Sequence, residues 1–182
     1  MKKVEHGKTF DRNAATPPAF EIFHNTVTEG YPKHWHTAIE IIMPTRGEYE
    51  VVVGKDSYNL KEGDIIMINS GVVHGMRFVS QGERIVMLVE PGCVENQEEM
   101  ETIFLRLPAI YFKKEDEEDP FYLFLRSQIL EMVREYDNES AVMTHRICTG
   151  LKELFSEFGR KGFSDANAQN TFGAMKQQEY IE

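Results

Sequence analysis

The sequence predicts a mainly β protein with an α-helical second part, that is, an antiparallel barrel or sandwich followed by a hairpin of two helices. Short runs rich in β-branched and aromatic residues extend from Phe20 to Glu90 and are separated by glycine-containing turns, which is typical of all-β folds. Beyond residue 90 the apolar residues recur with helical periodicity instead. The charge changes at the same place: residues 1–90 hold 12 acidic and 10 basic residues, and residues 91–182 hold 18 and 10.

Composition excludes several classes of protein. The 182 residues, 41% of them hydrophobic, are enough for one domain with a substantial core. No apolar stretch approaches the length of a membrane span, and no apolar segment follows the N-terminal lysines as it would in a secretory signal. We therefore expect a cytoplasmic protein that does not bind membranes. The net charge of −10 argues against nucleic-acid binding by this segment alone.

The strands are predicted from β-rich runs and their turns. Gly54-Lys55 fits a two-residue hairpin turn with glycine first. In the run before it, Tyr49, Val51 and Val53 alternate with polar neighbours and are expected to face inward. The expected strands are residues 20–27, 38–44, 48–54, 64–68, 72–79 and 84–90.

The second part is predicted to be helical. Residues 95–107 form a short helix candidate, and Asp119-Pro120 is typical of a helix start, with a capping aspartate and proline in the first position. The stripe of the helix that follows comprises Phe121, Phe124, Leu125, Ile129, Met132, Val133 and Tyr136. The stripe of the next helix comprises Ala141, His145, Cys148, Leu151, Leu154, Phe155 and Phe158. Such a hairpin must bury its stripes against the β-part or a second copy. We expect His145 to be an interface residue.

Two cysteines, Cys93 and Cys148, belong to no recognisable motif. In a chain without an export signal, two cysteines do not indicate a disulfide framework. We expect both to be unreactive thiols.

One group of residues has the composition of a metal site. His34, His36 and Glu40 share even numbering, so on an extended strand they would project from one face, with Trp35 on the other. His74 opens a later strand that can lie beside the first. Three imidazoles and a carboxylate suit a divalent ion such as Zn, Ni, Fe or Mn. The alternative is a metal-free polar network that lines an effector pocket.

These segments resemble the two motifs of the cupin superfamily, H-x-H-x3-E-x6-G and G-x5-P-x-G-x2-H-x3-N. The first is matched by His34, His36, Glu40 and Gly47, and the second by Gly63, Gly71 and His74. The sequence departs from the pattern at Gly30, which lies closer than usual to the first histidine, at Asn69 in place of proline, and at Phe78 in place of asparagine. The resemblance implies a cupin-type jelly-roll barrel with the four ligands in its mouth.

The order of the parts resembles the N-terminal half of an AraC-family transcription regulator, in which a barrel binds an effector and helices contribute to dimerisation. The closing segment FGAMKQQEYIE is similar to the start of the DNA-binding domain of that family. We therefore expect a flexible arm at residues 1–19, a cupin barrel at 20–92 and a helical dimerisation region at 93–160. Residues 161–182 would be a linker and the start of a C-terminal DNA-binding domain that continues beyond this chain.

The leading hypothesis is an effector-binding module that forms a homodimer, takes a sugar-like small molecule and reaches DNA only through that further domain. His34, His36, Glu40 and His74 would bind a metal or the effector. Tyr49, Met76 and Phe78 share the inward parity and would line the pocket. No catalytic residue is assigned. The alternatives are a stand-alone metal-dependent cupin enzyme, of dioxygenase or isomerase type, and a metal-free binding module without a DNA partner.

Overall fold

The structure is a computed structural model that describes residues 19–27, 29–93, 108–114 and 119–161. Nearly all of the expected N-terminal arm, the expected helix at 95–107 and the expected C-terminal linker lie outside the described residues. The strands are β1 Phe20–Val27, β2 Tyr31–His34, β3 Ile39–Arg46, β4 Tyr49–Val53, β5 Asp56–Leu60, β6 Ile65–Ile68, β7 His74–Phe78, β8 Gly82–Val89 and β9 Ala109–Phe112. A short 3-10 turn, η1 (Pro91–Cys93), and two long helices, α2 (Pro120–Asn138) and α3 (Met143–Lys161), complete the described elements.

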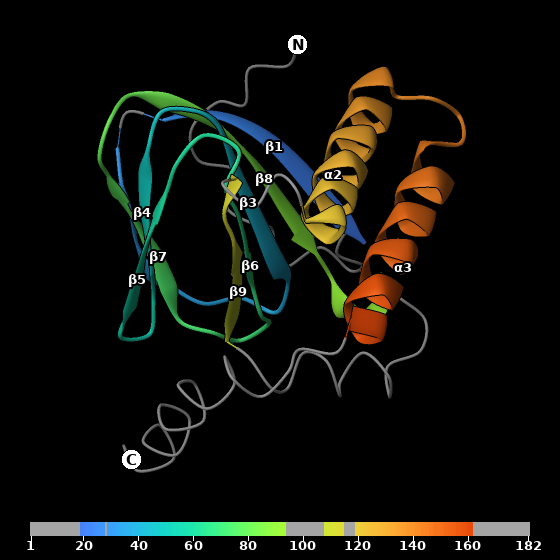
Figure 1. Ribbon diagram of the computed structural model, residues 1–182. Coiled ribbons are helices and arrows are strands. Elements are labelled where there is room, and N and C mark those ends of the chain that lie inside the picture. Colours follow the sequence, from blue (N-terminus) through green and yellow to red (C-terminus); the bar gives the residue numbers. More distant parts are fainter. Residues whose placement is uncertain (1–18, 28, 94–107, 115–118, 162–182) are drawn as a thin grey trace.

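The strands form two antiparallel sheets that face each other as a jelly-roll barrel. The larger sheet has the order β1-β8-β3-β6-β9, and the smaller has the order β2-β7-β4-β5. Figure 1 shows α2 and α3 side by side on one flank of the barrel, next to β1 and β8. The predicted fold class, a mainly β barrel followed by a helical hairpin, is confirmed.

The central strands β3 and β6 of the larger sheet are buried on both faces, which explains the nearly continuous apolar sequence of β3. Ile42 belongs to the core between the two sheets, whereas Ile41 and Met43 belong to the core between this sheet and the helices. A strand that is covered on only one face would alternate apolar and polar residues. The helices therefore form the third layer of the molecule.

Three strands escape the sequence prediction, each for a physical reason. β2 is short, contains Pro32 and has mostly exposed side chains. β5 lies at the edge of the smaller sheet and is mostly polar, although the Gly54-Lys55 turn before it forms as expected, with Gly54 at a φ of 58°. β9 lies within the stretch expected to be helical and pairs with β6. The barrel therefore extends past residue 92.

α2 begins as the sequence predicts. The Asp119 side chain accepts a hydrogen bond from the backbone N–H of Phe121, and proline occupies the first turn. The predicted stripe supplies most of the buried residues, but it misses Tyr122. The buried Tyr122 hydroxyl donates to the carbonyl of Gly63 at 2.8 Å and so joins the helix to the turn before β6.

The predicted stripe of α3 is wrong at its N-terminal end. Ala141 precedes the helix and is exposed, and His145 on its first turns is also exposed. Ile147 is buried in their place, because the helical phase that buries Leu151 and Phe155 turns position 145 to solvent. In this chain, His145 does not contribute to the interface between hairpin and barrel.

The two cysteines lie together, which the sequence prediction missed. Cys93 in η1 and Cys148 in α3 place their Sγ atoms 3.3 Å apart. Burial, together with the hydrogen bond to Cys148, raises the pKa of the Cys93 thiol to about 12. At neutral pH this thiol therefore stays protonated.

A buried carboxylate fastens β9 to the barrel. Asp64 accepts hydrogen bonds from the backbone N–H groups of Lys61 and Lys114, at 2.9 and 2.8 Å, and from the Tyr111 hydroxyl at 2.6 Å. It thereby joins the turn before β6 to both the middle and the end of β9.

We predict that Asp64→Ala lowers the free energy of unfolding by about 2–4 kcal/mol, because buried donors lose a charged acceptor. Tyr111→Phe removes one of these donors and leaves the carboxylate in place, so it should cost about 1 kcal/mol. Urea denaturation followed by circular dichroism measures both. Equal stability of Asp64→Ala and the parent would show that this junction does not hold β9.

Candidate metal centre

The four candidate ligands lie in four different parts of the backbone. His34 ends β2, His36 lies in the connection to β3, Glu40 lies in β3 and His74 opens β7. The expectation that His34, His36 and Glu40 share one extended strand is therefore wrong, because the chain crosses from the smaller sheet to the larger one between them. The expected neighbourhood of His74 is confirmed, since His34 and His74 are register partners across β2 and β7.

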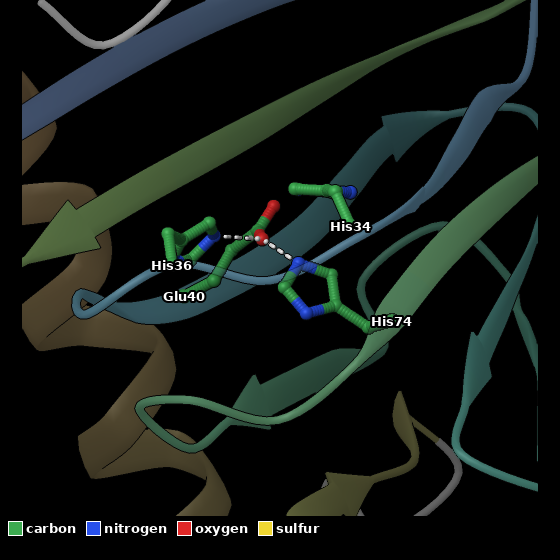
Figure 2. A group of neighbouring side chains, drawn as sticks. All are labelled: His34, His36, Glu40 and His74. Carbon is green, nitrogen blue, oxygen red and sulfur yellow. Dashed lines mark hydrogen bonds and ion pairs between the residues drawn. The ribbon is translucent and has the colours of Figure 1, made fainter. Parts of the chain in front are cut away.

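The side chains nevertheless converge on one point. Their donor atoms all lie within 4.8 Å of one another. Glu40 Oε2 is 2.7 Å from His74 Nε2 and 3.2 Å from His36 Nε2. Figure 2 shows the Glu40 carboxylate between these two rings, with His34 on the remaining side. Glu40 and His74 are buried, whereas His34 and His36 are half-buried.

All three imidazoles are held by backbone carbonyls on their outer nitrogen. The Nδ1 atoms of His34, His36 and His74 lie 3.0, 2.9 and 2.8 Å from the carbonyl oxygens of Pro32, Ala38 and Val72. A carbonyl oxygen can only accept, so each Nδ1 carries the proton. This leaves Nε2 for the centre of the cluster, the same outer-shell arrangement that orients metal-binding histidines.

The arrangement requires positive charge beside Glu40. With Nδ1 protonated, a neutral imidazole would present a bare Nε2 to the carboxylate, and two acceptors would meet. Burial alone would raise the pKa of Glu40, but hydrogen bonds from His36 and His74 outweigh it and lower the pKa to about 2. Burial alone would likewise lower the pKa of His74, but its bond to Glu40 raises the pKa overall. Without a metal, the positive charge is a proton on an imidazole.

The residues present fit a divalent metal ion. Three imidazole nitrogens and one carboxylate oxygen are a donor set suited to Zn, Ni, Fe or Mn. Burial lowers the pKa of His34, which favours the neutral form that a metal requires. A bound ion would replace the protons beside Glu40 and would supply Lewis acidity in the barrel mouth.

The expected pocket residues divide into two groups. Tyr49 and Met76 are buried inside the barrel, whereas Phe78, at the end of β7, is 44% exposed. Both Met76 and Phe78 border a cavity of about 450 Å³, together with Gly30, Tyr31 and Lys33, and Tyr49 does not. Trp35, which was expected on the face opposite to the histidines, lies in the connection after β2 and is exposed.

Sequence reasoning overlooked Arg84. This residue of β8 is buried, although it is charged. The signal that could have identified it is a charged residue that shares its parity with interior apolar residues, here Val86 and Leu88.

Residues 25–90 match the cupin domain family. The segment is thus similar to a cupin domain. It includes β2 to β8 and all four candidate ligands. No curated protein sequence gives a significant match to the chain.

Solved structures with a similar fold are distant in sequence. A conserved protein of unknown function from Streptococcus pyogenes is 18% identical, over 40% of this chain and 63% of its own, with a TM-score of 0.36. A variant of Bacillus subtilis oxalate decarboxylase is 18% identical, over 40% of this chain and 21% of its own, with a TM-score of 0.37. A cupin-2 domain protein from Shewanella frigidimarina is 16% identical over 42% and 76%, with a TM-score of 0.37. The chain thus spans less than two thirds of the first two.

The cupin motifs are tied to each other by the backbone. Gly71 has a φ of 74°, which favours glycine, and its N–H donates to the carbonyl of His36 at 2.8 Å. This bond fixes the loop that carries His36 to the turn that precedes His74. Asn69, where the motif has proline, donates its backbone N–H to the carbonyl of Pro108, a bond that proline could not make.

Neither α2 nor α3, the long helices that the structure describes, has a continuous apolar stretch sufficient for a membrane crossing.

We predict that the protein, purified without a nickel column, binds about one divalent ion per chain, since the donor set leaves room for one ion. His74→Ala should weaken the affinity for the ion tenfold or more. His145→Ala removes an exposed histidine and should bind metal as the parent does. Elemental analysis and titration with Zn and Mn measure both. A parent protein that takes up neither ion would contradict the prediction.

We predict that the metal-free protein is acid-sensitive because of Glu40. Its pKa falls from an ordinary 4.5 to about 2 on folding, so its contribution to stability is complete above pH 4.5 and is lost as the pH falls toward 2. Parent and Glu40→Gln, both in EDTA, should therefore differ in the slope of unfolding free energy against pH within this window, the parent falling more steeply. Parallel slopes would contradict the assignment.

Proposed function

We propose that this chain is the effector-binding and dimerisation part of an AraC-like transcription regulator. The observation that carries the proposal is the packing of the helical hairpin onto the barrel through one continuous core. This core joins side chains of β1, β3, β6 and β8 to those of α2 and α3. In such a regulator, an effector in the barrel must change the helices that set the spacing of the DNA-binding domains.

β3 supplies a direct route between the two. Glu40 belongs to the ligand cluster, and its neighbours Ile39 and Ile41 point to the opposite face, into the core shared with the helices. A shift of β3 around a bound ligand would therefore repack the contact with the hairpin. Polar contacts couple the same parts: Tyr122 bonds to Gly63, and His24 lies 3.4 Å from Asp137.

The proposed partners follow from this role. A small molecule, sugar-like by the family resemblance, would occupy the barrel. A second copy would cover part of the hairpin, where Leu123 and Leu130 lie seven residues apart on α2 and are 50% and 36% exposed. DNA would be reached through a domain beyond Glu182.

We predict a dimer that depends on this face of α2. Replacing Leu123 and Leu130 together by Glu should give a monomer, because apolar contact area would be replaced by charge. Val79→Glu, an equally exposed apolar position on the barrel side, should leave the dimer intact. Size-exclusion chromatography with light scattering measures the mass. A parent monomer, or a dimer of the double variant, would contradict the proposal.

The natural gene sequence after Glu182 tests the proposal that the protein is a transcription regulator. We expect about 100 further residues with two helix-turn-helix motifs after Glu182 and, in the complete protein, sequence-specific DNA binding. A natural stop codon after Glu182 would contradict this function.

A metal-dependent cupin enzyme, of dioxygenase or isomerase type, is the second candidate, favoured by the complete ligand set of His34, His36, Glu40 and His74. It requires stoichiometric metal in the purified protein, so a metal-free parent that cannot be loaded would argue against it. Uptake of metal together with the C-terminal DNA-binding domain would favour the regulator.

A further inference from the structure

Arg84 is a buried cation inside the barrel. It lies in β8 opposite Pro44 of β3 and Asn25 of β1. Its side chain shares the parity of Val86 and Leu88, which belong to or pack against the core between the two sheets. The residue is only 6% exposed.

The described surroundings give this guanidinium too few acceptors. Its Nε and Nη1 atoms are buried and have no hydrogen-bond partner among the residues that the structure describes. The hydroxyl of Tyr49 is also buried and has no hydrogen-bond partner among the described residues. The two residues are neighbours, since the guanidinium carbon lies 5.2 Å from the centre of the Tyr49 ring. Two adjacent groups thus present hydrogen-bond donors for which no described residue supplies an acceptor.

The contacts that Arg84 does have explain why it is tolerated but not why it is there. The ring of Tyr49 attracts the cation through its face, but it supplies no lone pair to an N–H. Burial lowers the pKa of Arg84, and the charge of Glu40 together with Tyr49 opposes this. Glu83, the preceding residue, is exposed and forms its ion pair with Arg46 rather than with Arg84. An unpaired buried charge destabilises a fold, so a negatively charged acceptor beside Arg84 would stabilise the barrel.

We propose that the barrel interior binds a small carboxylate-bearing metabolite, whose carboxylate is held by Arg84 and the Tyr49 hydroxyl. This rests on the proposed effector-binding function and replaces the sugar-like effector by an acidic one. A carboxylate has two acceptor oxygens and one charge, which matches one guanidinium and one hydroxyl. A phosphate would bring a second negative charge, whereas the protonated imidazole of His74 is already paired with Glu40.

The carboxylate site is distinct from the metal centre. Along the paired strands β3 and β8, Glu40 lies opposite Leu88 and Pro44 lies opposite Arg84. Four residues of strand separate the two positions, which is about 13 Å along the sheet. Ile42 and Val86 lie between them in the apolar core. The two backbone positions therefore lie apart along the strand pair, although the Arg84 side chain is near enough for the charge of Glu40 to raise its pKa.

The test uses acetate and formate, which carry the carboxylate and little else. Thermal unfolding and calorimetric titration compare them with acetamide, formamide and sodium chloride at equal ionic strength. A ligand that binds only the folded state raises the melting temperature. We expect acetate or formate to raise the melting temperature of the parent, with no rise from the amides or chloride.

Three variants identify the site. Arg84→Met should melt at or above the temperature of the parent without ligand, because an unpaired charge is gone, and it should not respond to acetate. Tyr49→Phe should weaken acetate binding severalfold. Arg77→Met removes an exposed arginine that pairs with Glu50, so it should respond as the parent does.

Several results would overturn the proposal. These are an equal effect of acetate and acetamide, an undiminished response of Arg84→Met, or a larger shift with inorganic phosphate than with any carboxylate. Destabilisation of ligand-free Arg84→Met would show that Arg84 already has a partner, such as a buried water. The readout needs neither a dimer nor DNA. If the protein is a dimer with a DNA-binding domain but does not bind acetate or formate, only the proposed ligand class is rejected. If it binds these anions but has neither the dimer nor the domain, only the regulator is rejected.

Discussion

The Glu40 carboxylate sets the main constraint on this molecule. It is buried at the point where the two sheets of the barrel approach each other, and three imidazoles surround it with their outer nitrogens already bound to backbone carbonyls. A carboxylate in such a place must be neutralised. The loop that carries His36, the turn at Gly71 and the pairing of β2 with β7 all place cationic or metal-binding nitrogens around it. Proton and metal ion are thus competitors for one position.

The sequence predicted the parts of the fold that depend on local pattern. The capping Asp119, the Gly54-Lys55 turn and the inward residues of β4 were all identifiable, because each follows from neighbours a few positions away. β5 and β9 were not, because edge strands with little buried surface carry a weak signal. The phase of α3 was misjudged by two residues at its start, where Ile147 rather than His145 meets the core.

The candidate site was identified for a reason that was only partly correct. The motif named His34, His36, Glu40 and His74, and the structure brings all four together. The assumed geometry, one strand with even residues on one face, does not occur. A connection between two sheets has no periodicity to read, so only the structure could show that His36 reaches the cluster from a loop. The closeness of Cys93 and Cys148, 55 residues apart, was equally beyond sequence pattern.

The burial of β3 on both faces has a consequence for how this protein can diverge. Along β3, even-numbered positions such as Glu40 and Ile42 face the barrel interior, and odd-numbered positions such as Ile41 and Met43 face the helices. The two faces of this eight-residue strand therefore contact different parts of the protein. Substitutions at even positions can alter what the barrel accepts while the packing of the hairpin is preserved. Paralogues could thus acquire new ligands and keep an unchanged output.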